Sequence, residues 1–334
     1  MTQNQRFVLA SRPKGMPTRE NFELKTEEAS QPGDGEIAVE TLYLSVDPYM
    51  RGRMNDTKSY AKPYEIGGTF GGGSVGRVTQ SRHASFKEGD IVQGGWGWQT
   101  HPVVSGDLAV KVDESLAPIQ TALGVLGMPG LTAYFGLLDI GQPKEGETVV
   151  VSGAGGAVGM IVGQIAKIKG ARVVGISGSE EKNRFLSDEL GFDAVVNYKT
   201  EPLNEALAAA CPDGADVYFD NVGGEVSDAV FQLLNANARI PLCGQISLYN
   251  VTQPEPGPRF LPLLLTRTAL VKGFLVGQYQ DRYAEAIPEM AGWLKDGRLK
   301  YRENIVEGFE RSPEAFLGLF SGENLGKQLV KVSD

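Results

Sequence analysis

The sequence predicts an α/β protein with two domains, one built on a doubly wound parallel sheet and one rich in β-strands. Strand and helix patterns alternate between residues 148 and 244, which is typical of a parallel sheet covered by helices. Residues 1–121 contain strand and turn patterns instead. A chain of 334 residues also exceeds one ordinary hydrophobic core, so two domains are expected.

The β-rich part is predicted from three segments. Residues 36–46 partly alternate apolar and polar side chains, as a half-buried strand does. Residues 67–76 contain too many glycines for a helix and favour tight turns or close backbone approach. Residues 86–92 resemble a turn that leads into a strand.

The parallel sheet is predicted from the segments that follow. Residues 130–138 favour a helix, and the apolar run at 148–151 favours a buried strand. The alternation then continues with helix 159–169, strand 171–176, helix 180–190, strand 194–198, helix 203–210, strand 215–220, helix 224–234 and strand 239–244. Three prolines between residues 252 and 258 indicate a stiff loop.

Composition excludes several classes of function. The formal net charge is −9 and no block of Lys or Arg occurs, so nucleic acid is a poor partner. No signal peptide and no apolar run of about 18 residues is present, so we expect no membrane partner. Cys211 and Cys243 do not make a disulfide framework, which favours a reducing compartment and a cytoplasmic location. Two histidines beside them make a Cys/His zinc site hard to assemble, and we expect no metal.

A glycine-rich turn at residues 152–159 lies where a predicted strand becomes a helix. The strict G-x-G-x-x-G spacing fails at Val158, and the pattern that fits is Gly153-x-x-Gly156-x-x-Gly159. Amide groups at a helix start attract a pyrophosphate, and glycines let it approach the backbone. The turn therefore predicts a dinucleotide site, the alternative being a tight turn without a ligand.

The end of the second strand of the sheet favours NADPH over NADH. Enzymes that use NAD usually place Asp or Glu there, whereas this chain has Ser177 followed by Gly178 and Ser179. Lys182 is close enough in sequence to pair with a 2′-phosphate. A second interpretation, compatible with the first, is that Ser179 is a helix N-cap and Lys182 is merely solvated.

Several strings of the chain resemble one family. They are residues 46–51 (VDPYMR), 127–134 (GMPGLTAY), 156–159 (GAVG), 197–200 (NYKT), 218–224 (YFDNVGG) and 243–250 (CGQISLYN). They are similar to the zinc-independent medium-chain dehydrogenase/reductases, in the branch of leukotriene B4 12-hydroxydehydrogenase/prostaglandin reductase, plant double-bond reductases and bacterial NADPH-dependent curcumin reductase. The resemblance covers essentially the whole chain. Residues 67–70 lack the Gly-His-Glu segment of the zinc-dependent relatives.

The resemblance implies a GroES-like catalytic and substrate domain of residues 1–121 and 296–334, with a Rossmann NADPH-binding domain of residues 122–295 between them. It also implies a homodimer formed through the Rossmann domains. Cofactor contacts are implied at Gly156, Ala157, Val158, Gly159, Lys182, Tyr198, Asn221, Cys243, Gly244, Ile246, Tyr249, Phe274, Leu275, Val276 and Asn324. Gly153 and Ser177 join this predicted set from the turn and from the strand end.

The reaction implied is hydride transfer to the β-carbon of an α,β-unsaturated carbonyl. Negative charge then grows on the carbonyl oxygen, where a hydrogen-bond donor, either a tyrosine hydroxyl or a ribose hydroxyl, lowers the barrier. Tyr249 is the first candidate, since a phenol is protonated at neutral pH and this one follows a strand end. The alternative is that Tyr249 only packs on the cofactor. Tyr49 is the second candidate, and Tyr64 and Met128 are weaker candidates for lining the substrate cleft.

Two other functions remain open at this point. A quinone reductase needs the same cofactor, and a non-enzymatic carrier or structural protein would only bind NADPH. No motif chooses among an alkenal, a curcumin-like dienone and a lipid enone as the substrate, because the shape of the pocket decides this.

Overall fold

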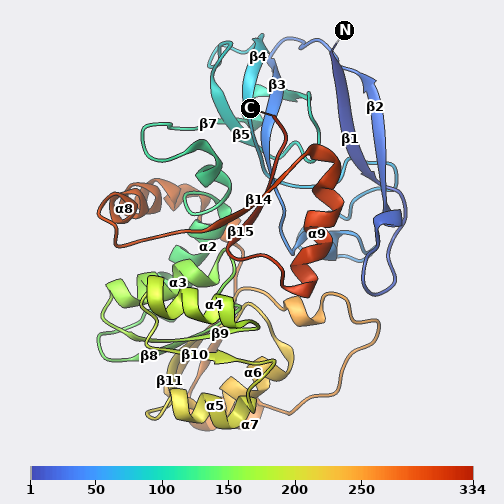
Figure 1. Ribbon diagram of the computed structural model, residues 1–334. Coiled ribbons are helices and arrows are strands. Elements are labelled where there is room, and N and C mark those ends of the chain that lie inside the picture. Colours follow the sequence, from blue (N-terminus) through green and yellow to red (C-terminus); the bar gives the residue numbers. More distant parts are fainter. Residues whose placement is uncertain (1, 334) are drawn as a thin grey trace. The chain divides into compact units, whose positions relative to one another are not determined.

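The computed structural model describes residues 2–333, and the chain divides into two compact units (Figure 1). The first contains residues 2–124 and 303–333, and the second contains residues 125–302. The first unit is dominated by antiparallel strands and the second by a parallel sheet covered by helices. The predicted fold class is confirmed.

The larger sheet of the first unit combines strands from both ends of the chain. Its order is β14-β15-β3-β4-β5-β7, and β6 also pairs with β3. The strands are β3 (Glu36–Ser45), β4 (Ser74–Ser81), β5 (Ile91–Gly94), β6 (Val103–Ser105), β7 (Val110–Lys111), β14 (Glu303–Glu307) and β15 (Lys327–Lys331). β3 corresponds to the strand predicted at 36–46. Because β15 pairs antiparallel with β3, the C-terminal segment belongs to this unit.

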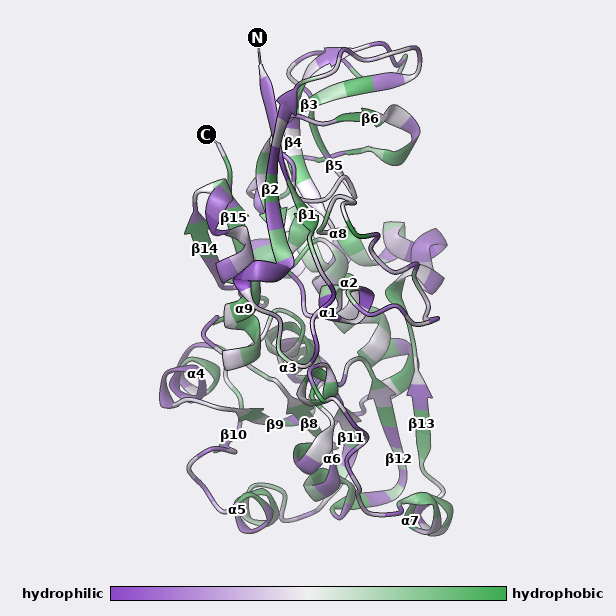
Figure 2. Cartoon of the chain, turned by 90° about the vertical axis from the view of Figure 1, so that its right-hand side faces the viewer, coloured by the Kyte–Doolittle hydropathy of each residue, from purple (hydrophilic) through white to green (hydrophobic). Residues whose placement is uncertain are grey.

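A two-stranded sheet and an aromatic cluster complete the first unit. β1 (Gln3–Leu9) and β2 (Phe22–Glu28) pair antiparallel, and Figure 2 shows β2 mostly in the colour of hydrophilic residues. Phe7, Phe70 and Trp98 are fully buried together with Phe316 of α9 (Ser312–Ser321). The short helix α1 (Met50–Arg53) packs Met50 into the same cluster.

The sheet of the second unit has the strand order β10-β9-β8-β11-β12-β13, and every pair is parallel. The strands are β8 (Thr148–Ser152), β9 (Arg172–Ser177), β10 (Ala194–Asn197), β11 (Ala215–Phe219), β12 (Leu234–Leu242) and β13 (Leu270–Gly273). Val149, Val150 and Val151 are fully buried, as expected for a strand covered on both faces. The chain winds from β8 to one edge and then from β11 to the other, which makes the β8/β11 boundary a topological switch point.

Helices connect these strands. They are α2 (Met128–Phe135), α3 (Gly159–Ile168), α4 (Glu180–Arg184), α5 (Leu203–Ala210), α6 (Gly224–Phe231), α7 (Leu261–Arg267) and α8 (Tyr283–Lys295). The helices predicted at 130–138 and 180–190 end in π-helical stretches, at Gly136–Gly141 and Phe185–Glu189. The last predicted strand, at 239–244, begins earlier, at Leu234.

Candidate functional site

The carboxyl ends of β8, β11 and β12 meet at the switch point of the second unit. Open parallel sheets bind ligands at this edge. Asn221, which follows β11, joins two of the ends, since its amide N–H donates to Ser152 Oγ (2.9 Å) and its Nδ2 donates to Ser152 O (2.8 Å). Gly153 continues from β8 with φ +58°, a conformation that favours glycine.

The glycine turn after β8 has no room for side chains at its critical positions. A Cβ at Gly159 would overlap the carbonyl oxygen of Gly153 and lie 2.7 Å from Ala154 Cα. A Cβ at Gly156 would lie 3.2 Å from the same oxygen. The turn passes through Ala157 and Val158 into α3, where the amide of Met160 donates to Gly156 O at 3.2 Å and that of Ile161 donates to Val158 O at 3.1 Å. A turn whose glycines have no side chains, placed at the start of a helix, fits a pyrophosphate.

Asp220 fixes the loops around this edge, and it is absent from the residues that we predict for the site. It is 1% exposed. Within residues 2–333, none of the groups that donate a hydrogen bond to its carboxylate is a cation. Its Oδ1 accepts from Ser152 Oγ, Tyr218 OH, Val222 N and Gly223 N, and its Oδ2 accepts from Ser227 Oγ and Gln245 Nε2, all within 2.7–3.1 Å. One carboxylate thus ties together the segments after β8, β11 and β12. Its place at the end of a predicted strand is the signal that marks it.

The segment after β12 carries Cys243, Gly244 and Tyr249. The amides of Cys243 and Gly244 donate to the carbonyl oxygen of Asp220 at 2.9 and 3.0 Å. Burial, and then the charge of Asp220, raise the pKa of Cys243 to about 12, so it is a neutral thiol. After a single helical turn, Ile246–Leu248, the hydroxyl oxygen of Tyr249 accepts from the Gln245 amide at 3.4 Å.

The ends of β9 and β10 place Ser177, Lys182 and Tyr198 near one another. Ser177 is buried and donates to Asn183 Oδ1 at 2.6 Å. Ser179 is the N-cap of α4, as the sequence predicts, and accepts from the amide of Lys182. A Cβ at Gly155 would lie 3.1–3.2 Å from three carbons of the Lys182 side chain, so this side chain runs along the glycine turn.

The other predicted residues of the second unit are Phe274, Leu275, Val276 and Met128. The first three follow β13 and leave the sheet at the same edge as the glycine turn. Phe274 is buried against Phe219, whereas the side chain of Leu275 is exposed. Met128 begins α2 and is partly exposed, and its carbonyl oxygen accepts from Thr132 Oγ1.

Tyr49 lies in the first unit, beside a buried ion pair. Lys327 Nζ donates to Asp47 Oδ1, Val46 O and Gln328 O, each at 2.9 Å, and the side chains of Lys327 and Asp47 are only 4% and 7% exposed. Burial, and then the charge of Asp47, hold the pKa of Tyr49 well above its usual range. Its phenol therefore stays protonated and can donate.

Tyr64 and Asn324 also belong to the first unit. Tyr64 is buried, and its hydroxyl donates to the carbonyl oxygen of Gly71 at 2.6 Å. Its ring contacts Phe70, with 4.6 Å between the ring centroids. Asn324 is half-buried and its Nδ2 donates to Gly326 O at 2.8 Å.

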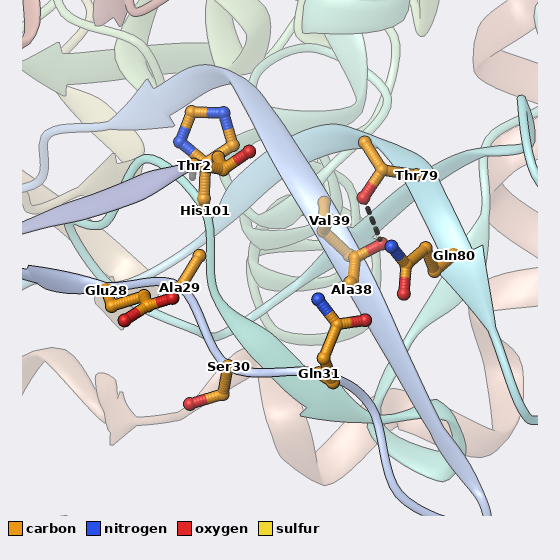
Figure 3. A pocket seen from close by; sticks show the side chains of 10 residues that line it. All are labelled: Thr2, Glu28, Ala29, Ser30, Gln31, Ala38, Val39, Thr79, Gln80 and His101. Atoms are coloured by element: carbon orange, nitrogen blue, oxygen red, sulfur yellow. Dashed lines mark hydrogen bonds between the residues drawn. The ribbon is translucent and has the colours of Figure 1, made fainter.

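A cavity of about 300 Å³ lies elsewhere in the first unit (Figure 3). Thr2, Glu28, Ala29, Ser30, Gln31, Ala38, Val39, Thr79, Gln80 and His101 line it. None of the residues predicted for the site is among them. Within residues 2–333, no group of three His, Cys, Asp or Glu side chains is placed to hold a metal ion. In the same range no helix has the length and apolar character needed to cross a membrane.

Two family models match the chain. The N-terminal domain of oxidoreductase matches residues 5–112, and zinc-binding dehydrogenase matches residues 157–292. A putative NADP-dependent oxidoreductase of Bacillus subtilis is 57% identical over 99% of this chain and 98% of its own. The NADPH-dependent curcumin reductase of Escherichia coli is 50% identical, over 99% and 97% of the two chains. Prostaglandin reductase 1 of Mus musculus is 46% identical, over 99% and 100%.

Solved structures agree with these relatives. CurA of Vibrio vulnificus in complex with NADPH has a TM-score of 0.95 and 48% identity, over 99% of both chains. The Escherichia coli quinone oxidoreductase, also with NADPH, has a TM-score of 0.79 over 98% of this chain and 99% of its own. At 21% identity that second likeness shows the fold alone. On whole-chain identity, matching family models and shared fold, this chain belongs to the medium-chain dehydrogenase/reductase family.

Proposed function

We propose that the protein is an NADPH-dependent reductase of the carbon–carbon double bond of α,β-unsaturated aldehydes and ketones. The observation that carries this proposal is 50% identity along the whole chain to an NADPH-dependent curcumin reductase. Curcumin is itself a conjugated carbonyl compound. Prostaglandin reductase 1, at 46% identity, supports the same class of reaction.

The residues at the sheet edge fit NADPH. We propose that the turn from Gly153 to Gly159 binds the pyrophosphate. Gly156 and Gly159 have no side chain at positions where a Cβ would crowd the turn, so a phosphate can approach the backbone. Toward the adenosine end we place Ser177, Lys182 and Tyr198. The rest of the predicted set is Asn221, Cys243, Gly244, Ile246, Tyr249, Phe274, Leu275 and Val276, together with Asn324 of the first unit. NADPH bound there supplies the hydride.

Tyr249 is proposed as the donor to the substrate oxygen, and Tyr49 is the second candidate. Tyr249 accepts a hydrogen bond from the Gln245 amide, and an accepted hydrogen bond makes a hydroxyl a better donor. Its hydroxyl would donate to the enolate oxygen as charge develops there. Tyr49 is the second proposed donor, since its raised pKa keeps it protonated. The α-carbon then takes a proton from a side chain or from water.

The position of solvent-derived hydrogen tests this reaction. We would run the reduction of a trans-2-alkenal with unlabelled NADPH in D2O and analyse the product by NMR. The proposal predicts a saturated aldehyde with deuterium at the α-carbon and none at the β-carbon. An allylic alcohol with its double bond intact would show carbonyl reduction and contradict the proposal.

A quinone reductase is the second candidate, and its support is weaker because the likeness to quinone oxidoreductase is one of fold. Binding of NADPH without turnover of any conjugated carbonyl or quinone would favour a carrier or structural role.

We further propose that the two units have different roles. The first unit, with Tyr49 and Tyr64, would be the substrate domain, and the second unit would be the NADPH-binding domain, with Met128 as a further candidate for a substrate contact.

We also propose a homodimer formed through the second unit. β13 ends the parallel sheet next to β12, as Figure 2 shows, and its edge is open within the described residues. Leu270 and Val271 of β13 are exposed, as are Leu261 (79%) and Leu265 (77%) of α7. An exposed apolar edge strand is a ready site for pairing with another chain.

Light scattering after gel filtration tests the dimer. We expect twice the chain mass for the wild type and a shift toward the monomer for Val271→Lys. Leu108→Lys, at an apolar side chain of the first unit that is 76% exposed, is the matched control and should leave the mass unchanged. A monomeric wild type would contradict the proposal.

A cytoplasmic location is proposed as well, on the ground that Cys211 and Cys243 are both unpaired.

A further inference from the structure

We propose that Lys199 is a second binding residue for the 2′-phosphate of NADPH and that it contributes to selectivity for NADPH over NADH. The inference rests on the proposed function. The sequence singles out Lys182 for this phosphate, the family resemblance implies a cofactor contact at Tyr198, and neither gives Lys199 a role. The structure brings Lys199 to the same place through the turn that follows β10.

The backbone of Lys199 is held in place by the strand ends. β10 pairs with β9, and Asn197 is the register partner of Ser177. The amide of Tyr198 donates to Ser177 O at 3.1 Å, and the amide of Lys199 donates to Asn197 Oδ1 at 3.1 Å. Asn197 is itself buried, and its Nδ2 donates to Glu180 Oε1 at 3.0 Å. This turn is therefore fixed to the edge of the sheet.

The side chain of Lys199 runs back over the loop after β9. A Cβ at Gly178 would lie 3.1 Å from Lys199 Cε and 2.8 Å from Tyr198 Cε1. The Lys199 ammonium lies 5.9 Å from the centroid of the Tyr198 ring. Lys182 lies in the same way along Gly155 of the neighbouring loop. Lys182 thus lies along a glycine in the loop after β8, and Lys199 lies along a glycine in the loop after β9.

The two ammonium groups are near enough to repel each other. Burial is the first cause that lowers the pKa of Lys182, and the charge of Lys199 is the second. Lys199 makes no ion pair with any side chain of residues 2–333 that would offset this repulsion. A phosphate monoester carries about −1.5 to −2 charges at neutral pH. Placed between the two lysines it would replace repulsion by attraction, whereas the 2′-hydroxyl of NADH would not.

Glu181 is the carboxylate that acts on this pair, since its charge raises the pKa of Lys182. Glu181 is exposed and belongs to the first turn of α4. Glu180, its neighbour, accepts from Asn197. The side chains that lie along Gly155 and Gly178 are thus two lysines and one phenol. Because Lys199 is exposed, its contribution is that of a partly solvated charge and not of a buried one.

Calorimetric titration tests the inference without relying on turnover. The ligands are NADPH, NADH, 2′,5′-ADP and 5′-AMP, and the variants are Lys199→Gln and Lys199→Arg. Lys144→Gln is the matched control, because Lys144 is an exposed lysine of the same unit in the turn that leads into β8. We expect Lys199→Gln to weaken NADPH and 2′,5′-ADP roughly tenfold, with NADH and 5′-AMP within about twofold. Lys199→Arg should keep most of the affinity, and Lys144→Gln should keep all of it.

Three results would overturn the inference. Unchanged affinity of Lys199→Gln for 2′,5′-ADP would show that Lys199 does not bind the phosphate. An equal loss for NADPH and NADH would show a merely structural role. A wild type that binds both cofactors equally would overturn the assignment of NADPH itself, and this outcome is visible before any variant is made.

Discussion

Gly159→Ala tests the steric basis of the dinucleotide turn. An added Cβ would overlap Gly153 O and lie 2.7 Å from Ala154 Cα, where ordinary contacts begin at 3.4 Å. Both neighbours are backbone atoms, so the turn must move by roughly 1 Å. Overpacking of this kind costs about 1–3 kcal/mol, which exceeds the gain of up to ~1 kcal/mol from alanine in a helix. At about 2–4 °C per kcal/mol, the melting temperature should fall by several degrees.

The same shift should weaken cofactor binding, because the amides of the turn no longer converge on one phosphate position. We expect NADPH affinity to fall by at least roughly tenfold, measured by quenching of protein fluorescence. Gly292→Ala is the matched control, since that helical glycine has no atom within 4 Å of an added Cβ. It should leave binding unchanged and raise stability slightly. If Gly159→Ala melts and binds NADPH like the wild type, the turn is not the close-packed cradle described here.

Three further predictions follow from individual side chains. Tyr249→Phe should lower kcat/KM for an enone about 10²–10³-fold in steady-state assays, with NADPH affinity unchanged within about threefold. Lys327→Met leaves Asp47 buried without its partner and should cost about 3–5 kcal/mol in urea unfolding, whereas a cost below ~1 kcal/mol would contradict the buried ion pair. Burial raises the pKa of Cys211 to about 11 and that of Cys243 to about 12, so both thiols are neutral at pH 8. Their alkylation by iodoacetamide should be roughly 10²-fold or more slower than that of a model thiol and should speed up about tenfold per pH unit; rapid alkylation at pH 8 would refute this.

Local periodicity was enough to predict the centre of the second unit. β8, α3 and β9 were predicted because a buried valine run, a glycine turn and an apolar helix follow one another in the sequence. β13 and α8 were not predicted. β13 is a short, exposed edge strand, and α8 contains Pro288, which normally argues against a helix.

The parts that depend on distant segments were beyond local patterns. β15 joins β3 across most of the chain, and only the resemblance to a family implied that the C-terminal segment belongs with the N-terminal domain. The sequence marks Asp220 only as a member of the family string 218–224. Its own role depends on three loops that meet in space. Lys199 was missed for the same reason, since its neighbour Gly178 is on another strand end.

Turnover with matched substrates tests the central claim most directly. Loss of NADPH absorbance would be followed with trans-2-alkenals, acyclic enones and simple quinones, with NADH in parallel. We predict that kcat/KM is highest for conjugated aldehydes or ketones, that the product is the saturated carbonyl, and that NADPH is preferred over NADH. Turnover of quinones alone, or tight NADPH binding with no turnover of any conjugated carbonyl, would contradict it.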